Sequence, residues 1–104
     1  MIEKKNFYIN GKWVSPVKPN DFDVIDPSTE EAFAVISLGS IEDTDKAVSA
    51  AKVAFETWRE TSKEERVKLL EKFCEIYNRR WDEMVEAQSM GNGCTIRFCI
   101  RNSY

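Results

Sequence analysis

Residues 62–87, SKEERVKLLEKFCEIYNRRWDEMVEA, predict a long amphipathic helix and contribute most to the choice of fold. Ser62 is suited to cap this helix, because Glu65 three residues later completes a capping box. Apolar side chains then recur at helical spacing and form one stripe over about five turns. The members of this stripe are Val67, Leu70, Phe73, Cys74, Tyr77, Trp81, Met84 and Val85. We therefore expect one continuous helix over about residues 63–87.

A second amphipathic helix is expected before it, at about residues 44–59. Ser40 and Asp43 form a similar capping pattern, and Asp43 and Asp45 would lie near the positive end of the helix dipole. Alanine dominates the apolar face, which allows close approach by a partner element. That face consists of Ala47, Val48, Ala51, Ala54, Phe55 and Trp58.

Two β-hairpins are expected in the first forty residues. The sequence FYINGKWV at residues 7–14 places Asn10-Gly11 between apolar runs, which is a strong hairpin signal because both turn positions need positive φ. Strands at residues 22–26 and 32–38 form a wider hairpin around the turn at residues 27–30. Asp26 is expected to form an Asx turn before Pro27. The predicted fold class is α+β, with two β-hairpins followed by two amphipathic helices.

Composition excludes several classes of function. The chain has 104 residues, of which 42% are hydrophobic and 32% charged, so it suits one small domain. It contains no histidine, the commonest general base near neutral pH and the commonest metal ligand. The net charge of −3 argues against nucleic-acid binding. The uncharged run at residues 32–41 is about half the length of a bilayer crossing, so we expect no membrane association. The three cysteines are an odd set without an export signal, so we expect reduced thiols and a cytoplasmic location.

No residue is assigned a catalytic, cofactor-binding or metal-binding role from these patterns. Cys94 and Cys99 lack the paired ligands of a zinc site, and Cys74 is expected to be a small buried hydrophobe of the helix stripe. A thiol-redox or metal protein built on Cys74, Cys94 and Cys99 stays an alternative. The glycines of Gly91-Asn92-Gly93 favour a flexible turn over a dinucleotide fingerprint, because the third glycine of that fingerprint is missing.

Charged and aromatic residues give one functional signal. Arg79-Arg80 are expected to be solvated, and the carboxylates near both helix starts are explained by capping. Trp13, Trp58 and Trp81 lie in three separate elements, and two helices with two hairpins can hardly shield all of them. An exposed apolar patch marks an interface or a missing partner.

Residues 7 to about 88 resemble the N-terminal segment of the NAD(P)-dependent aldehyde dehydrogenase superfamily. The resemblance rests on a series of short motifs in the order and spacing of that family. They are Ile9-Asn10-Gly11-Lys12-Trp13, Asp26-Pro27-Ser28-Thr29-Glu30, Asp45-x-Ala47-Val48-x-x-Ala51, Ala54-Phe55-x-x-Trp58 and Glu65-Arg66-x-x-Leu69-Leu70. The resemblance implies the N-terminal part of an α/β enzyme that oxidises aldehydes to carboxylic acids with NAD or NADP.

The same resemblance implies that this chain alone is catalytically inactive and binds no cofactor. In the family the nucleophilic cysteine, the general-base glutamate and the nucleotide site all lie downstream of this region, so none maps onto a residue here. The alternative is a small acidic interaction module that uses its exposed aromatic side chains to bind a partner protein. Self-association through the apolar helix faces is a further expectation.

A change in charge sets the last residues apart. Residues 1–88 carry 13 basic and 18 acidic side chains, whereas residues 89–104 carry two arginines and no acid. We therefore expect an aldehyde dehydrogenase-like segment at residues 1–88 and a divergent tail at residues 89–104. A shifted reading frame, a truncated gene model and a genuine short product are the alternatives for that tail.

Overall fold

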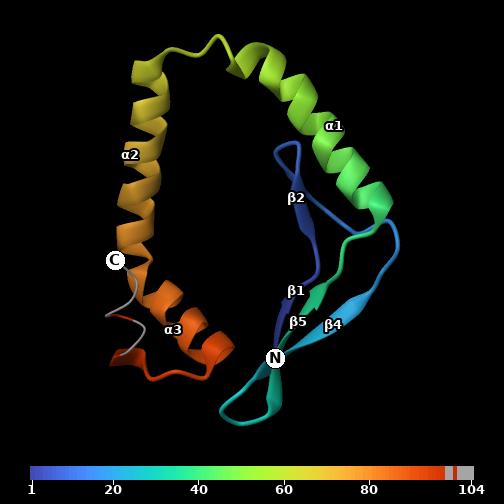
Figure 1. Ribbon diagram of the computed structural model, residues 1–104, viewed down its shortest axis with the longest axis vertical. Helices are drawn as coiled ribbons and strands as arrows, with labels where there is room; N and C mark the ends of the chain where they lie inside the picture. Colours follow the sequence, from blue (N-terminus) through green and yellow to red (C-terminus); the bar gives the residue numbers. More distant parts are fainter. Residues whose placement is uncertain (98–99, 101–104) are drawn as a thin grey trace. The chain divides into compact units, whose positions relative to one another are not determined.

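The computed structural model describes residues 1–97 and residue 100 (Figure 1). The chain divides into two compact units. The first combines Met1–Val24 with Ala32–Glu60, and the second combines Ile25–Glu31 with the chain from Thr61 onward. Each unit contains segments from both halves of the sequence, because the tip of one hairpin belongs to the second unit.

A three-stranded sheet with the strand order β1-β5-β4 contains both strands of the wider predicted hairpin. β4 spans Asp21–Asp26, β5 spans Glu31–Ser37, and the two lie side by side in Figure 1. The added strand β1, Ile2–Lys4, runs parallel to β5 with Ile2 opposite Ala34. The sequence pattern does not predict β1, because three residues show no alternation and their partner is thirty residues away.

The first hairpin forms as predicted. β2, Phe7–Ile9, pairs antiparallel with β3, Lys12–Val14. Asn10 and Gly11 have φ of 53° and 73°, the left-handed values that a tight hairpin turn requires. The rings of Tyr8 and Trp13 are opposite each other and meet edge to face with centroids 5.2 Å apart.

Helix α1 spans Ile41–Trp58 and begins three residues earlier than the pattern predicts. The predicted capping box at its start is confirmed. The Asp43 amide donates to the Ser40 hydroxyl at 3.3 Å, and the Ser40 amide donates to the Asp43 carboxylate at 3.0 Å. The next helix has the same device, because Ser62 and Glu65 exchange the equivalent bonds at 3.2 Å.

The long helix predicted over residues 63–87 is two helices. α2 spans Lys63–Arg79 and α3 spans Trp81–Asn92. Arg80 separates them with φ −101° and ψ 18°, outside the helical values. The expectation of one continuous helix is therefore wrong. The apolar period continues across Arg80, so the sequence pattern gives no sign of the break.

The end of α3 corrects a second expectation. Gly91 and Asn92 form its last turn, and Gly93 follows in the left-handed conformation with φ 62°. The three residues are thus a helix end with a glycine C-cap and not a flexible turn. The boundary expected at residue 88 lies inside this helix.

Very little apolar surface is buried within the part of the chain that the structure describes. Ala34 in β5 and Val85 in α3 are the buried hydrophobic side chains there, at 7% and 5% exposure. By contrast, many large apolar side chains of α1 and α2 are at least 40% exposed. The two units therefore present apolar faces that their own described residues leave open.

Candidate functional site

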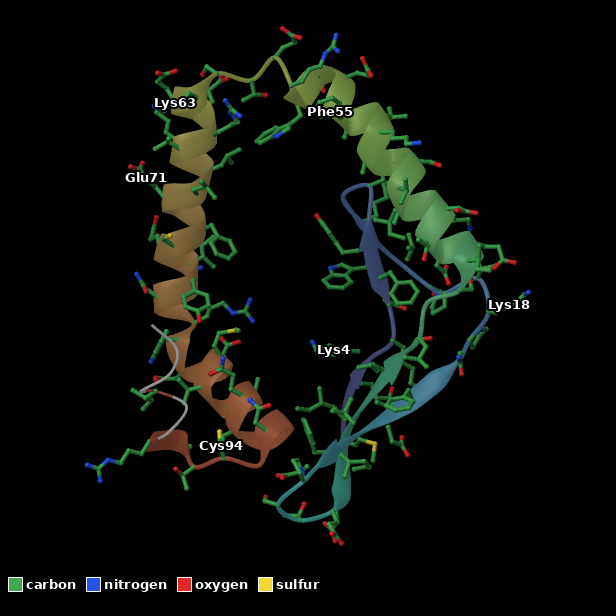
Figure 2. All side chains as sticks on the ribbon, in the orientation of Figure 1. Lys4, Lys18, Phe55, Lys63, Glu71 and Cys94 are labelled. Atoms are coloured by element: carbon green, nitrogen blue, oxygen red, sulfur yellow. The ribbon has the colours of Figure 1, made fainter. Side chains whose placement is uncertain are left out.

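An apolar stripe of the second unit runs along α2 to the first residue of α3 and is here called the aromatic face. It comprises Val67, Leu70, Phe73, Tyr77 and Trp81. Leu70 and Phe73 are 65% and 64% exposed, whereas Tyr77 and Trp81 are half-buried. Phe73 stacks on Tyr77 with centroids 6.3 Å apart, and Tyr77 meets Trp81 edge to face at 5.7 Å. Figure 2 shows the aromatic rings of α2 on the side of the helix opposite the labelled Glu71.

A cavity of about 360 Å³ lies where α2 meets α3. Its walls are Phe73, Ile76, Tyr77, Arg80 and Met84. Sequence reasoning placed Phe73, Tyr77 and Met84 on one stripe but missed Ile76 and Arg80, because Arg80 was expected to be a solvated residue of a continuous helix. These five positions follow one another at helical spacing, so they lie on one side of the α2–α3 segment.

The charge of Arg80 in this cavity is already neutralised by a neighbour. Its Nη2 and Nε both donate to Oε2 of Glu83, at 2.7 and 3.1 Å. Hydrogen bonding and charge attraction within this pair raise the pKa of Arg80 and lower the pKa of Glu83. With its cation paired and its other walls apolar, the cavity is suited to receive apolar side chains.

The first unit carries a groove between β2 and the start of α1. One cavity of about 450 Å³ extends from Phe7 and Ile9 to Gly39 and Ala47. A second cavity, of about 330 Å³, continues along the alanine-rich face of α1. β2 is the element that approaches this face, and small side chains allow that approach. The neighbouring Val48, Phe55 and Trp58 of α1 stay about half exposed, and Phe55 is labelled in Figure 2.

Asp43 holds the connector before β4 onto the start of α1. Its side chain is buried at 5% exposure, and its Oδ1 accepts the Val17 amide at 3.0 Å while its Oδ2 accepts the Ser40 amide at 3.0 Å. These backbone donors, that of Ser40 first, lower the pKa of Asp43. A carboxylate held ionised by backbone amides is a structural group and a poor general acid.

The cysteines depart from expectation. Cys74 is free but exposed, so its expected role as a small buried hydrophobe is wrong: the aromatic face of α2 is not covered by the described residues. Cys94 is disulfide-bonded, which contradicts the expectation of a reduced thiol for that residue. Cys99 lies outside the described residues. Within residues 1–97 and 100, no three histidine, cysteine, aspartate or glutamate side chains gather where they could hold a metal ion.

The tryptophans partly follow expectation. Trp13 is 70% exposed and Trp58 is 46% exposed, as expected for a chain with too few elements to cover three tryptophans. Trp81 is half-buried against Tyr77. Among the described residues, no helix is long and apolar enough to cross a bilayer.

The described residues do not fit a nicotinamide cofactor. A dinucleotide phosphate is held by a glycine-rich turn between a strand and the N-terminus of a helix. Gly91 and Gly93 instead lie at the C-terminus of α3, where the helix dipole repels anions. The exposed Arg79 ends α2, and Arg80 is bonded to Glu83.

Comparison with known proteins identifies the family. The sequence profile described as "Aldehyde dehydrogenase family" matches residues 13–102, which includes most of the segment beyond residue 88. The chain is 42% identical over 87 residues to a 3-succinoylsemialdehyde-pyridine dehydrogenase from a Pseudomonas species. That alignment covers 84% of this chain and 18% of the relative.

Solved structures that resemble this chain are aldehyde dehydrogenases as well. An aldehyde dehydrogenase from Bartonella henselae is 52% identical and superposes with a TM-score of 0.96 over 98% of this chain and 21% of its own. An aldehyde dehydrogenase from Pseudomonas syringae, solved with NAD+ and octanal, is 37% identical with a TM-score of 0.89, covering 91% of this chain and 20% of its own. The chain thus spans about a fifth of the length of the relatives it matches and corresponds to their N-terminal part. It belongs to the aldehyde dehydrogenase family.

Proposed function

We propose that this chain serves as the N-terminal packing segment of an enzyme that oxidises an aldehyde to a carboxylic acid with NAD or NADP. In this proposal the chain supplies surfaces that the rest of the enzyme covers, and it supplies no catalytic or nucleotide-binding group. The observation that carries the proposal is the exposure of Leu70 and Phe73 on the aromatic face of α2, in a chain that spans about a fifth of its relatives. Exposed apolar surface on this scale marks an interface.

The cavity chemistry supports packing over catalysis. The two cavities between β2 and α1 are walled mainly by β2 and the small residues of α1, and the cavity at the α2–α3 junction has its cation paired with Glu83. A third cavity of the first unit is lined by Glu3, Lys4, Lys5, Asn6 and Trp13, and its Lys5 is paired with Glu3 and Asp21. Asp43 and Glu83 owe their lowered pKa values to capping and to ion pairing, and Asp26 owes its lowered pKa to the hydrogen bonds from Ser28 in its turn. Such groups stabilise local structure and are poorly suited to move protons at neutral pH.

The second candidate is an interaction module that binds a partner protein or self-associates through the same aromatic face. Its support is the same exposure, together with 70% exposure of Trp13 on the first hairpin. The cytoplasmic location, and the absence of nucleic-acid and membrane partners, stay predictions from composition.

A chimera tests the first proposal. Residues 1–104 of this chain would replace the matching fifth of the Bartonella henselae relative, and NADH formation would be followed with a panel of aldehydes. We expect aldehyde-dependent turnover by the chimera and none by the 104-residue chain alone. Activity of the purified chain that scales with its concentration would refute the proposal.

A charge variant separates the two candidates. Leu70→Asp in the chimera should abolish soluble, active enzyme, because it buries an unpaired carboxylate at the covered face. Lys68→Asp, at an exposed position of the same helix, is the matched control and should leave activity within about twofold. Full activity of the Leu70→Asp chimera would favour the interaction module.

A further inference from the structure

The break between α2 and α3 has no local cause in the sequence. Sharp helix kinks usually occur at proline, at glycine or serine pairs, or where a group inserts into the hydrogen-bond ladder. Residues 78–82, NRRWD, contain neither proline nor glycine. The N-cap position of α3 makes no side-chain capping bond, in contrast to Ser40 and Ser62 at the starts of α1 and α2.

The departure from helical geometry is confined to one residue. The Arg80 amide is shared between the carbonyl oxygens of Ile76 at 3.0 Å and Tyr77 at 3.1 Å. Its own carbonyl already accepts the Met84 amide at 3.2 Å, which is the first helical bond of α3. The Tyr77–Trp81 ring pair, with the spacing of neighbours on one helix face, bridges the break. Rotations of about 40° in φ and about 60° in ψ at Arg80 would restore a single helix.

The far end of α3 is held by the turn between β4 and β5. A Cβ added to Gly93 would lie 3.0 Å from Cγ of Pro27 and 3.1 Å from the amide nitrogen of Ser28, so the two backbones are in close contact. Asp26 stiffens that turn, because its Oδ1 accepts the Ser28 amide at 2.8 Å and the Ser28 hydroxyl at 2.7 Å. All of these residues belong to the second unit.

We propose that Arg80 is a hinge between a bent and a straight form of the α2–α3 segment, and that contact of Gly93 with Pro27 and Ser28 selects the bent form. The turn thereby sets the direction in which α2 presents its aromatic face. The ion pair of Arg80 with Glu83 does not distinguish the two forms, since i, i+3 pairs form equally well in a straight helix.

Distance measurement in the full 104-residue chain tests this hinge. Bioorthogonal spin labels would be placed at the exposed positions 68 and 86, one on each helix, with trimethylamine N-oxide present to favour compact states. Eighteen residues are five turns, so a straight helix would separate the two labelled backbones by about 27 Å on one face. The bent form requires a shorter distance.

Two variants and one control complete the experiment. Gly93→Ala places a methyl group against Pro27 and Ser28 and also forces an alanine to φ 62°. Pro27→Ala carries no such strain, because it removes the facing ring atoms without altering α3, and it is therefore the decisive variant. Both should raise the population near 27 Å at the expense of the shorter distance, and Pro27→Ala should do so with unchanged or increased helical ellipticity. Gly91→Ala is the matched control, because a Cβ there meets nothing within 4 Å, and it should leave the distance unchanged.

Three results would overturn the proposal. The starting chain could already show the straight-helix distance. The Gly93→Ala and Pro27→Ala distributions could coincide with that of the Gly91→Ala control. Helical ellipticity of Pro27→Ala could fall as the distance broadens, which would mean that α2 or α3 melts when the contact is lost and that Arg80 is not a hinge.

Discussion

Leu70→Ala should lower the free energy of unfolding less than Val85→Ala does, although leucine is the larger residue. Leu70 is 65% exposed in this chain, so about a third of its side chain leaves water. Full burial of a leucine contributes about 1.5–3 kcal/mol, so Leu70→Ala should cost about 0.5–1 kcal/mol here. Val85 is only 5% exposed, and Val85→Ala should cost about 2 kcal/mol through lost burial and the cavity left behind.

Urea unfolding followed by far-ultraviolet circular dichroism measures both costs, with trimethylamine N-oxide added to favour the compact state. In the chimera with the Bartonella henselae relative, where the proposal covers α2, Leu70→Ala should instead cost about 2–5 kcal/mol and exceed the cost of Val85→Ala. A Leu70→Ala cost in the chain alone that equals the Val85→Ala cost would refute the exposure of this face.

Three further effects follow from local geometry. Ser62→Ala removes the hydroxyl that accepts the Glu65 amide and should lower helix stability by about 1 kcal/mol, as measured by thermal unfolding. Gly11→Ala forces an alanine to φ 73° and should cost about 1–2 kcal/mol, whereas Gly39→Ala, which meets only Phe7 at an ordinary 3.8 Å, should be close to neutral. The lowered pKa of Asp43 stabilises the fold above its unfolded value of about 3.9, and that contribution disappears as pH falls through the lower native value. Asp43→Asn should therefore flatten the acid limb of a pH–stability curve.

Local signals predicted local structure well. Asn10-Gly11 specified the first hairpin because only a few residue types adopt positive φ at both turn positions. The Ser62 and Glu65 pair located the start of α2, since capping is satisfied within four residues of chain. The Asx turn expected at Asp26 is confirmed by its two bonds from Ser28.

Features that depend on distant residues were missed. β1 forms by pairing with β5, and residues 2–4 contain no sequence pattern that predicts this pairing. The break at Arg80 interrupts neither the apolar period nor the helix propensity, so the sequence did not predict it. Nor did the sequence predict that Arg80 would line a cavity with Ile76 and Met84. Periodicity identified the aromatic face correctly, but it could not tell that Cys74 would be left exposed.

Hydroxyl-radical footprinting of Leu70 and Phe73, in the chain alone and in the chimera, tests the central claim most directly. Both side chains are about two-thirds exposed here, so we predict rapid oxidation in the chain alone and several-fold protection in the active chimera. Val85 is the internal reference and should be protected in both proteins. Equal oxidation of Leu70 and Phe73 in the two proteins would contradict the claim that the rest of an aldehyde dehydrogenase covers this face.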